Sequence, residues 1–152
     1  MNPIKKTRLF IAIAILTLAA VNVSSAQCGA AIKAGIKKLD PYQHNGQVNS
    51  CTLVLGEPAQ IHLSFYKGLY YKLQVCSETA VGKVNFRVMD ENNAELYNSE
   101  TASQGDSFEF FSNSSQELVV EIVSADKNKQ GCAGIVVGMK IPKASNNNIR
   151  NL

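Results

Sequence analysis

The chain has 152 residues, of which 45% are hydrophobic and 18% are charged, and its formal net charge is +3. This length suits one domain, and the hydrophobic fraction is sufficient to build a core. The basic excess comes from residues 1–26, which contain Lys5, Lys6 and Arg8 and no acidic residue, so the rest of the chain is formally neutral. A neutral chain has no general electrostatic attraction for phosphate backbones or anionic lipid, which argues against nucleic acid and membrane surfaces as partners.

The first 26 residues have the organisation of a secretory signal peptide. The basic residues precede an apolar run from Leu9 to Val21, and small residues follow at Ser24-Ser25-Ala26. That order is typical of a signal peptide, and the apolar run is too short to be a convincing membrane span. We therefore predict cleavage after Ala26 and a mature protein that is secreted or periplasmic, with no membrane insertion after cleavage.

All four cysteines, Cys28, Cys51, Cys76 and Cys132, lie beyond the predicted cleavage site. An even number of cysteines in an exported chain favours a framework of two disulfides. No two of them have the close spacing of zinc-ligand pairs, so we predict no metal site and no cofactor.

A short amphipathic helix is expected directly after the signal peptide, over residues 28–39. Ile32, Ile36 and Leu39 recur at helical spacing, and lysines occupy the other side. The helix should end before Pro41, because the residue preceding a proline is disfavoured in the helical region. Glycines weaken the segment, so its stability should depend on packing against the rest of the domain.

From residue 51 onward, the apolar residues recur at every second position, which is the pattern of strands with one face on a core and one face in water. Residues typical of turns separate the segments. The expected strands cover residues 51–55, 60–65, 69–76, 83–88, 94–98, 107–112, 118–122 and 132–141. Strands at this spacing without intervening helices predict an all-β fold, an eight-stranded antiparallel β-sandwich of jelly-roll-like form with one short N-terminal helix.

The predicted organisation has four parts. Residues 1–26 are the signal peptide, and residues 27–50 are a helix and linker packed on the domain. Residues 51–142 are the β-sandwich, and residues 143–152 are an Asn-rich tail, nearly without apolar residues, that we expect to be disordered.

The alternation of the strands also suggests which cysteines pair. Cys76 ends one strand and Cys132 begins the last strand, and both point away from the apolar face of their strands. Adjacent antiparallel strands would bring these ends together, which predicts a Cys76–Cys132 disulfide and leaves Cys28–Cys51 as the second bridge. Gly134 and Gly138 share the outward face with Cys132, where they either leave room for a close neighbour or mark bulges.

Motifs for catalysis are mostly missing from the sequence. No glycine-rich phosphate loop, Gly-x-Ser-x-Gly turn or His-Glu-x-x-His helix occurs. His62 and Ser64 can share one strand face, but a catalytic triad also requires an orienting acid and an oxyanion hole. The cluster from Asp90 to Asn93 fails the calcium-loop pattern and is expected to be a hairpin turn, with a Ca²⁺ site as the alternative. We therefore predict no catalytic residues.

Aromatic residues are the remaining candidates for recognition. Tyr66 and Tyr70 flank a turn, Tyr70 shares its strand face with Lys72 and Gln74, and Phe111 could add apolar surface. Tyrosine beside amide and ammonium donors can stack on a sugar ring or become buried in a protein contact. The alternative is that these aromatic side chains cover a strand edge or lie beneath the N-terminal helix.

Two resemblances follow from these segments. The order of strands between Ala59 and Lys140 resembles that of bacterial pre-peptidase C-terminal-like domains, which are β-sandwiches that act as binding or adhesion modules. The resemblance is carried by the segments 67–75, 84–90, 108–110 and 118–122. The Val75-Cys76 and Gly131-Cys132 segments, together with the two glycines after Cys132, resemble small secreted proteins of Bacteroidetes-type bacteria that have no assigned activity. The first resemblance implies a binding role, and both imply a location outside the cytoplasm.

The function predicted from the sequence is a secreted, non-enzymatic binding module that engages a glycan or a cell-envelope protein. Its candidate ligand-binding residues are Tyr66, Tyr70, Lys72 and Gln74. The alternative is a small secreted hydrolase or a hydrolase inhibitor, of which the inhibitor requires binding and no catalytic groups.

Overall fold

The structure is a computed structural model that describes residues 23–103 and 105–142. It contains one described helix followed by eight strands, as predicted. The elements are α2 (Val23–Lys37), β1 (Gln43–Leu53), β2 (Ala59–Phe65), β3 (Tyr70–Ser77), β4 (Val84–Met89), β5 (Glu95–Asn98), β6 (Ser107–Phe111), β7 (Gln116–Ser124) and β8 (Gly131–Lys140). The predicted disordered tail and most of the predicted signal peptide lie outside the described residues.

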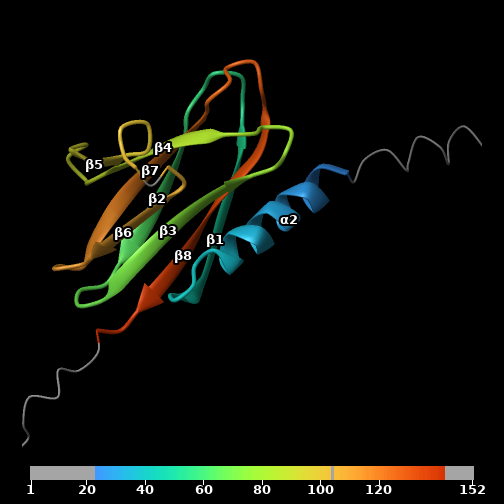
Figure 1. The fold of residues 1–152 in the computed structure, drawn as a ribbon. Helices are drawn as coiled ribbons and strands as arrows, with labels where there is room; N and C mark the ends of the chain where they lie inside the picture. The colour runs from blue at the N-terminus through green and yellow to red at the C-terminus, as the bar shows by residue number, and fades with distance from the viewer. Residues whose placement is uncertain (1–22, 104, 143–152) are drawn as a thin grey trace, which may run out of the picture.

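The strands form two antiparallel sheets of four strands each (Figure 1). Sheet A has the strand order β1-β8-β3-β6, and sheet B has the order β2-β7-β4-β5. Most connections cross from one sheet to the other, so most neighbouring strands within a sheet are distant in sequence, and β4 and β5 are consecutive. Two packed four-stranded sheets with this connectivity form a jelly roll, which confirms the predicted fold class.

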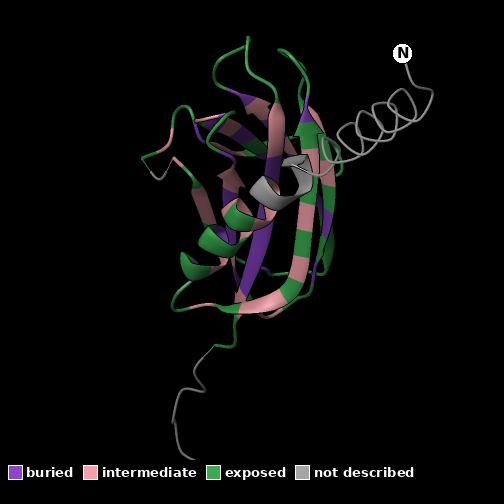
Figure 2. Ribbon diagram, turned by 90° about the vertical axis from the view of Figure 1, so that its right-hand side faces the viewer, coloured by how far each residue is buried: buried purple, intermediate pink, exposed green. Residues whose placement is uncertain are grey.

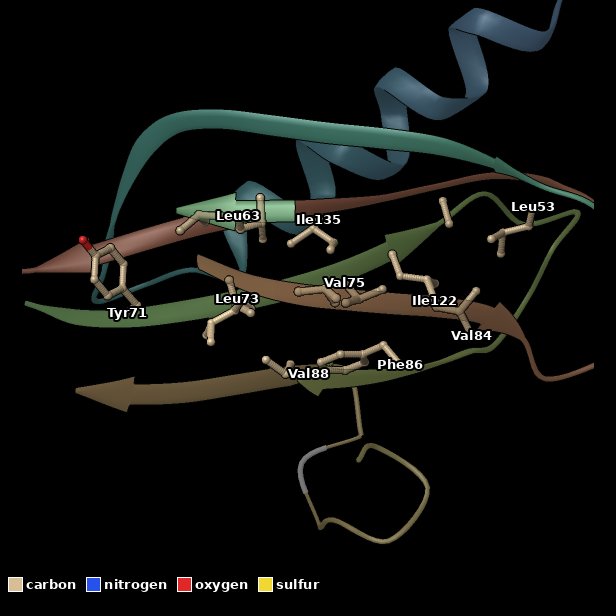
Figure 3. Packing of buried hydrophobic residues seen from close by; sticks show 14 of the residues in the cluster. Leu53, Leu63, Tyr71, Leu73, Val75, Val84, Phe86, Val88, Ile122 and Ile135 are labelled. Atoms are coloured by element: carbon tan, nitrogen blue, oxygen red, sulfur yellow. The ribbon is translucent and has the colours of Figure 1, made fainter. Parts of the chain in front are cut away.

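The core lies between the two sheets, where the alternating apolar residues of both meet (Figure 3). Tyr71, Leu73 and Val75 of β3 face inward and are buried. Leu118, Val120 and Ile122 of β7 line the same interior. The alternation read from the sequence therefore assigned the inward face of these strands correctly.

The helix α2 packs on the outer face of sheet A, mainly against β8 and β3 (Figure 1). Its close approach depends on glycines in β8. A Cβ atom on Gly134 would lie 3.3 Å from Cγ1 of Ile32, and one on Gly138 would lie 2.7 Å from Cβ of Tyr42. These glycines therefore leave room for a close neighbour, which was one of the two predicted possibilities. The side of the helix that faces away from the sheet is exposed (Figure 2).

Two predicted boundaries, the starts of β1 and of α2, differ by several residues from the structure. The strand β1 begins at Gln43 rather than at Cys51, so part of the expected linker belongs to sheet A. The dipeptide Asn45-Gly46, a combination typical of turns, lies within β1 at an irregularity of its pairing with β8. The helix α2 begins at Val23, before the predicted cleavage site, and ends at Lys37, before Pro41 as expected.

The predicted disulfide pairing was wrong, because Cys132 is bonded to Cys28. Cys76 lies opposite Gly134. Gly134 is two residues from Cys132 on the same outer face, so the Cα of Cys76 is diagonal to that of Cys132. Diagonal neighbours are about 7–8 Å apart, which exceeds the usual Cα separation in a disulfide. Cys28 on α2 lies directly over Cys132, with a Cα–Cα distance of 5.5 Å.

The predicted Cys28–Cys51 bridge was wrong for a different reason. Cys51 lies opposite the buried Ala133 in the pairing of β1 with β8, so its side chain is on the core side of sheet A. Cys28 lies on the helix side, and the sheet separates the two. Cys51 and Cys76 are free thiols, and burial raises the pKa of both.

Candidate binding surface

The candidate surface is centred on an exposed aromatic pair at the end of β3. Because Tyr71 points into the core, its neighbour Tyr70 points to the outer face of sheet A. Tyr70 lies opposite Phe111 of the edge strand β6, and the centroids of the two rings are 4.8 Å apart. Tyr70 is 41% exposed and Phe111 is 40% exposed. Neither ring is beneath α2, because the helix packs over the opposite end of β3, near Cys76.

Tyr66 lies in the loop that joins β2 to β3 and has the most exposed ring of the three, at 69%. The loop is held in place by hydrogen bonds. The backbone N–H of Tyr66 donates to the hydroxyl of buried Tyr71 at 3.0 Å, and the N–H of Gly68 donates to the carbonyl of Ser112 at 2.7 Å. Gly68 has a φ of 86°, which favours glycine at this turn. Tyr66 is therefore presented to solvent from a fixed backbone.

Lys72 and Gln74 do not provide the free surface donors that the sequence suggested. The ammonium of Lys72 pairs with Glu109 at 3.3 Å, and the side chain is only 14% exposed. Gln74 is buried, and its amide donates to the backbone carbonyls of Val75 and Asp106, both at 3.0 Å. Gln74 thus secures the loop before β6 instead of facing a ligand.

Sequence reasoning missed two residues that border the aromatic pair. Tyr42 follows α2 and donates its hydroxyl to Glu109 at 3.0 Å, and Lys140 lies opposite Tyr70 with its ammonium 5.7 Å from the Tyr42 ring centroid. Burial and the hydrogen bond to Glu109 raise the pKa of Tyr42, so its hydroxyl remains a neutral donor. The register of β8 against β3, which the sequence alone does not give, brings Lys140 to this surface.

The surface defined by Tyr66, Tyr70, Phe111, Tyr42 and Lys140 is called here the aromatic surface. It combines exposed ring area with one exposed ammonium group, since Lys140 is exposed and Lys72 is already paired. Aromatic rings next to a cationic side chain are typical of the centres of protein interfaces. The arrangement is suited to binding and contains no reactive group.

The His62 and Ser64 pair has gained an acidic neighbour but does not form a triad. Nδ1 of His62 lies 2.8 Å from Oε1 of Glu117, on the outer face of sheet B. Among the hydrogen bonds of the described residues, none joins Ser64 to His62. The side chains of His62 and Glu117 are more than half exposed, at 60% and 55%. A serine nucleophile requires a base within hydrogen-bond distance and an oxyanion hole, and this arrangement supplies neither.

The Asp90 cluster forms the predicted hairpin turn between β4 and β5. Oδ1 of Asp90 accepts hydrogen bonds from the N–H groups of Asn92 and Ala94, both at 2.8 Å. Asn93 takes the left-handed conformation, with φ of 62°. Within the part of the chain that the structure describes, no group of three or more His, Cys, Asp or Glu side chains is placed to hold a metal ion. Among these same residues, no helix is long and apolar enough to cross a membrane.

No protein-family model matches the chain, and no curated protein sequence matches it. Among solved structures, the periplasmic inhibitor of g-type lysozyme PliG from Aeromonas hydrophila is similar with a TM-score of 0.48 and 9% identity, over 62% of this chain and 85% of that one. PliG from Salmonella Typhimurium is similar with a TM-score of 0.43 and 13% identity, over 64% and 89% of the two chains. A de novo designed double-stranded β-helix is similar with a TM-score of 0.33 and 14% identity, over 62% and 99%. At such scores and identities, the similarity concerns the general arrangement of strands and assigns neither a partner nor an activity.

Proposed function

We propose that this protein is an exported, non-enzymatic module that binds another protein through the aromatic surface. The observation that carries the proposal is the exposed Tyr70–Phe111 ring pair, which lies outside the area that α2 covers. A neutral domain has no charge steering, so its affinity must come from desolvated aromatic area together with a few donors.

A protein partner fits this surface better than a glycan. Sugar recognition requires several hydrogen-bonding side chains around an aromatic ring, in addition to stacking. Lys72 is engaged by Glu109, and Gln74 is buried, so the donors that the sequence placed beside Tyr70 are already used. The tilted Tyr70 and Phe111 rings, with 52° between their planes, instead offer an exposed apolar contact.

Inhibition of a hydrolase is the specific form of protein binding that remains as the alternative. It requires only that a surface of the module cover the active site of the enzyme, and no catalytic group on the module. A panel of cell-wall hydrolases, including a g-type lysozyme, should be assayed with and without the purified protein. A fall in hydrolysis that depends on Tyr70 would assign the partner class directly.

The proposed binding site can be tested by site-specific photo-crosslinking. A photoreactive phenylalanine analogue at Phe111 should give a discrete crosslinked protein in the cell-envelope fraction. The matched control is the same analogue at Leu96, which is 48% exposed on the edge strand β5. Equal crosslinking from both positions, or none from Phe111, would reject the aromatic surface as the binding site.

A further inference from the structure

A hollow of about 460 Å³ lies on the helix side of the molecule, between α2 and the segment that joins β3 to β4. It exists because the helix residues above it are too small to fill the space. It is separate from the aromatic surface, since Val75 and Tyr70 are five residues apart along β3, or about 16 Å. Its apolar lining comes mainly from Ala31, Ala34 and Gly35 of α2, since Val75 and Val84, which also border it, are buried in the core.

The charges around this hollow are predominantly positive. Lys38 lines it and pairs with Asp106, with 2.8 Å between Nζ and Oδ2, so these two charges balance. Lys83 also lines it, is exposed, and makes no side-chain hydrogen bond or ion pair with the rest of the described chain. The ammonium of Lys129 is near the same rim, 3.4 Å from the position that a Cβ atom on Gly82 would occupy. The rim therefore carries a positive charge without a partner.

We propose that this hollow is a binding site for a small carboxylate with an apolar body, of the kind represented by a medium-chain fatty acid. The carboxylate would pair with Lys83, and the apolar chain would lie against Ala31 and Ala34 of α2. A volume of about 460 Å³ falls in the range of small-molecule sites, and the lining sets the small apolar residues of α2 beside polar groups of Ser77, Lys83 and the Lys38–Asp106 pair. The unpaired charge at the rim selects an anion over a cation or a neutral alcohol.

Cys76 provides a built-in reporter of occupancy, because its side chain lines the hollow. Its thiol is free, and the Sγ atom is 3.2 Å from the position that a Cβ atom on Gly35 would occupy. Cys51 is the matched control, since it is also a free thiol but lies on the core side of sheet A. A molecule in the hollow should therefore slow alkylation of Cys76 and leave that of Cys51 unchanged.

The test is a calorimetric titration of the purified protein, with its disulfide intact, using octanoate as the probe. We expect octanoate to bind at least about tenfold more tightly than acetate, which lacks the apolar body. Lys83→Met should weaken octanoate binding by about three- to tenfold. Lys33→Met, on an exposed helix position outside the hollow, should have no effect.

Ala34→Leu tests the cavity itself, because the larger side chain should occupy the hollow and remove octanoate binding. Ala34 is exposed on α2, and leucine is a good helix former, so the variant should fold. Absence of measurable octanoate binding would overturn the proposal. Binding that survives both Lys83→Met and Ala34→Leu, or protection of Cys51 equal to that of Cys76, would overturn it as well. Loss of partner binding at the aromatic surface would not affect this result.

Discussion

The packing of α2 on sheet A can be tested by adding a single methyl group at Gly138. In Gly138→Ala, the new Cβ atom would lie 2.7 Å from Cβ of Tyr42 and 3.2 Å from Cδ2 of Leu39. The first distance is shorter than real contacts allow, and Cβ of Tyr42 is fixed to the backbone. The segment after α2 would therefore have to move away from the sheet, and the buried side chain of Leu39 would move with it.

The expected loss can be estimated from two opposing effects. Overpacking a well-packed site costs about 1–3 kcal/mol of unfolding free energy. Replacing glycine by alanine adds about 0.4–1 kcal/mol to the unfolding free energy, because the unfolded chain has less conformational entropy to lose on folding. Gly138 does not have a positive φ, so backbone strain does not contribute. We expect Gly138→Ala to lower the unfolding free energy by about 1–2 kcal/mol.

Urea denaturation followed by circular dichroism, with the disulfide oxidised, measures this change. The matched control is Gly29→Ala, because a Cβ atom at this helix position would meet nothing within 4 Å. The control should gain about 0.5–1 kcal/mol from the higher helix propensity of alanine. If Gly138→Ala is as stable as the wild type, or more stable, Gly138 is not needed for the close approach of the segment after α2 to sheet A.

Three further predictions concern the disulfide, pH and export. Non-reducing peptide mapping should find Cys28 linked to Cys132, and a link from Cys132 to any other cysteine would refute the assignment. Because the bridge spans 104 residues, its reduction should lower the free energy of unfolding by up to about 4–5 kcal/mol. The hydrogen bond and charge of Lys38 lower the pKa of Asp106, so their stabilisation is present above about pH 4 and is lost as the pH falls through the lowered pKa. Between about pH 4 and pH 2, the melting temperature of Asp106→Asn should therefore fall by less than that of the wild type. An equal fall in both proteins would count against a stabilising Lys38–Asp106 pair. Mass spectrometry of the secreted or periplasmic fraction should find a chain that begins at or near Gln27, and an intact N-terminus in the cytoplasm would end the export hypothesis.

The strand pattern was predictable because alternation reports which face of a strand is apolar. In the strand predicted over residues 69–76, the alternation puts Tyr71, Leu73 and Val75 on the apolar face, and the structure buries all three. Alternation does not report what covers the opposite face. Tyr70 and Gln74 share the outer face of β3, yet the first is exposed and the second is buried beneath the loop before β6.

The cysteine pairing failed for a related reason. Alternation placed Cys76 and Cys132 on the same outer face, which the structure confirms, but a disulfide also depends on register and on elements outside the sheet. The register sets Cys76 opposite Gly134, and α2 brings Cys28 over Cys132. The two glycines on that face were the one signal in the sequence that something packs closely there.

The binding role of the aromatic surface is tested most directly by the dissociation constant of the crosslinked partner, once it is purified. We expect the double variant Tyr70→Ala and Phe111→Ala to weaken binding by about 2–4 kcal/mol, or roughly 30- to 1,000-fold, because it removes both central rings. Leu96→Ala, an exposed apolar side chain on β5 of sheet B, should leave the dissociation constant unchanged. A folded double variant that binds its partner as tightly as the wild type would contradict the proposed function.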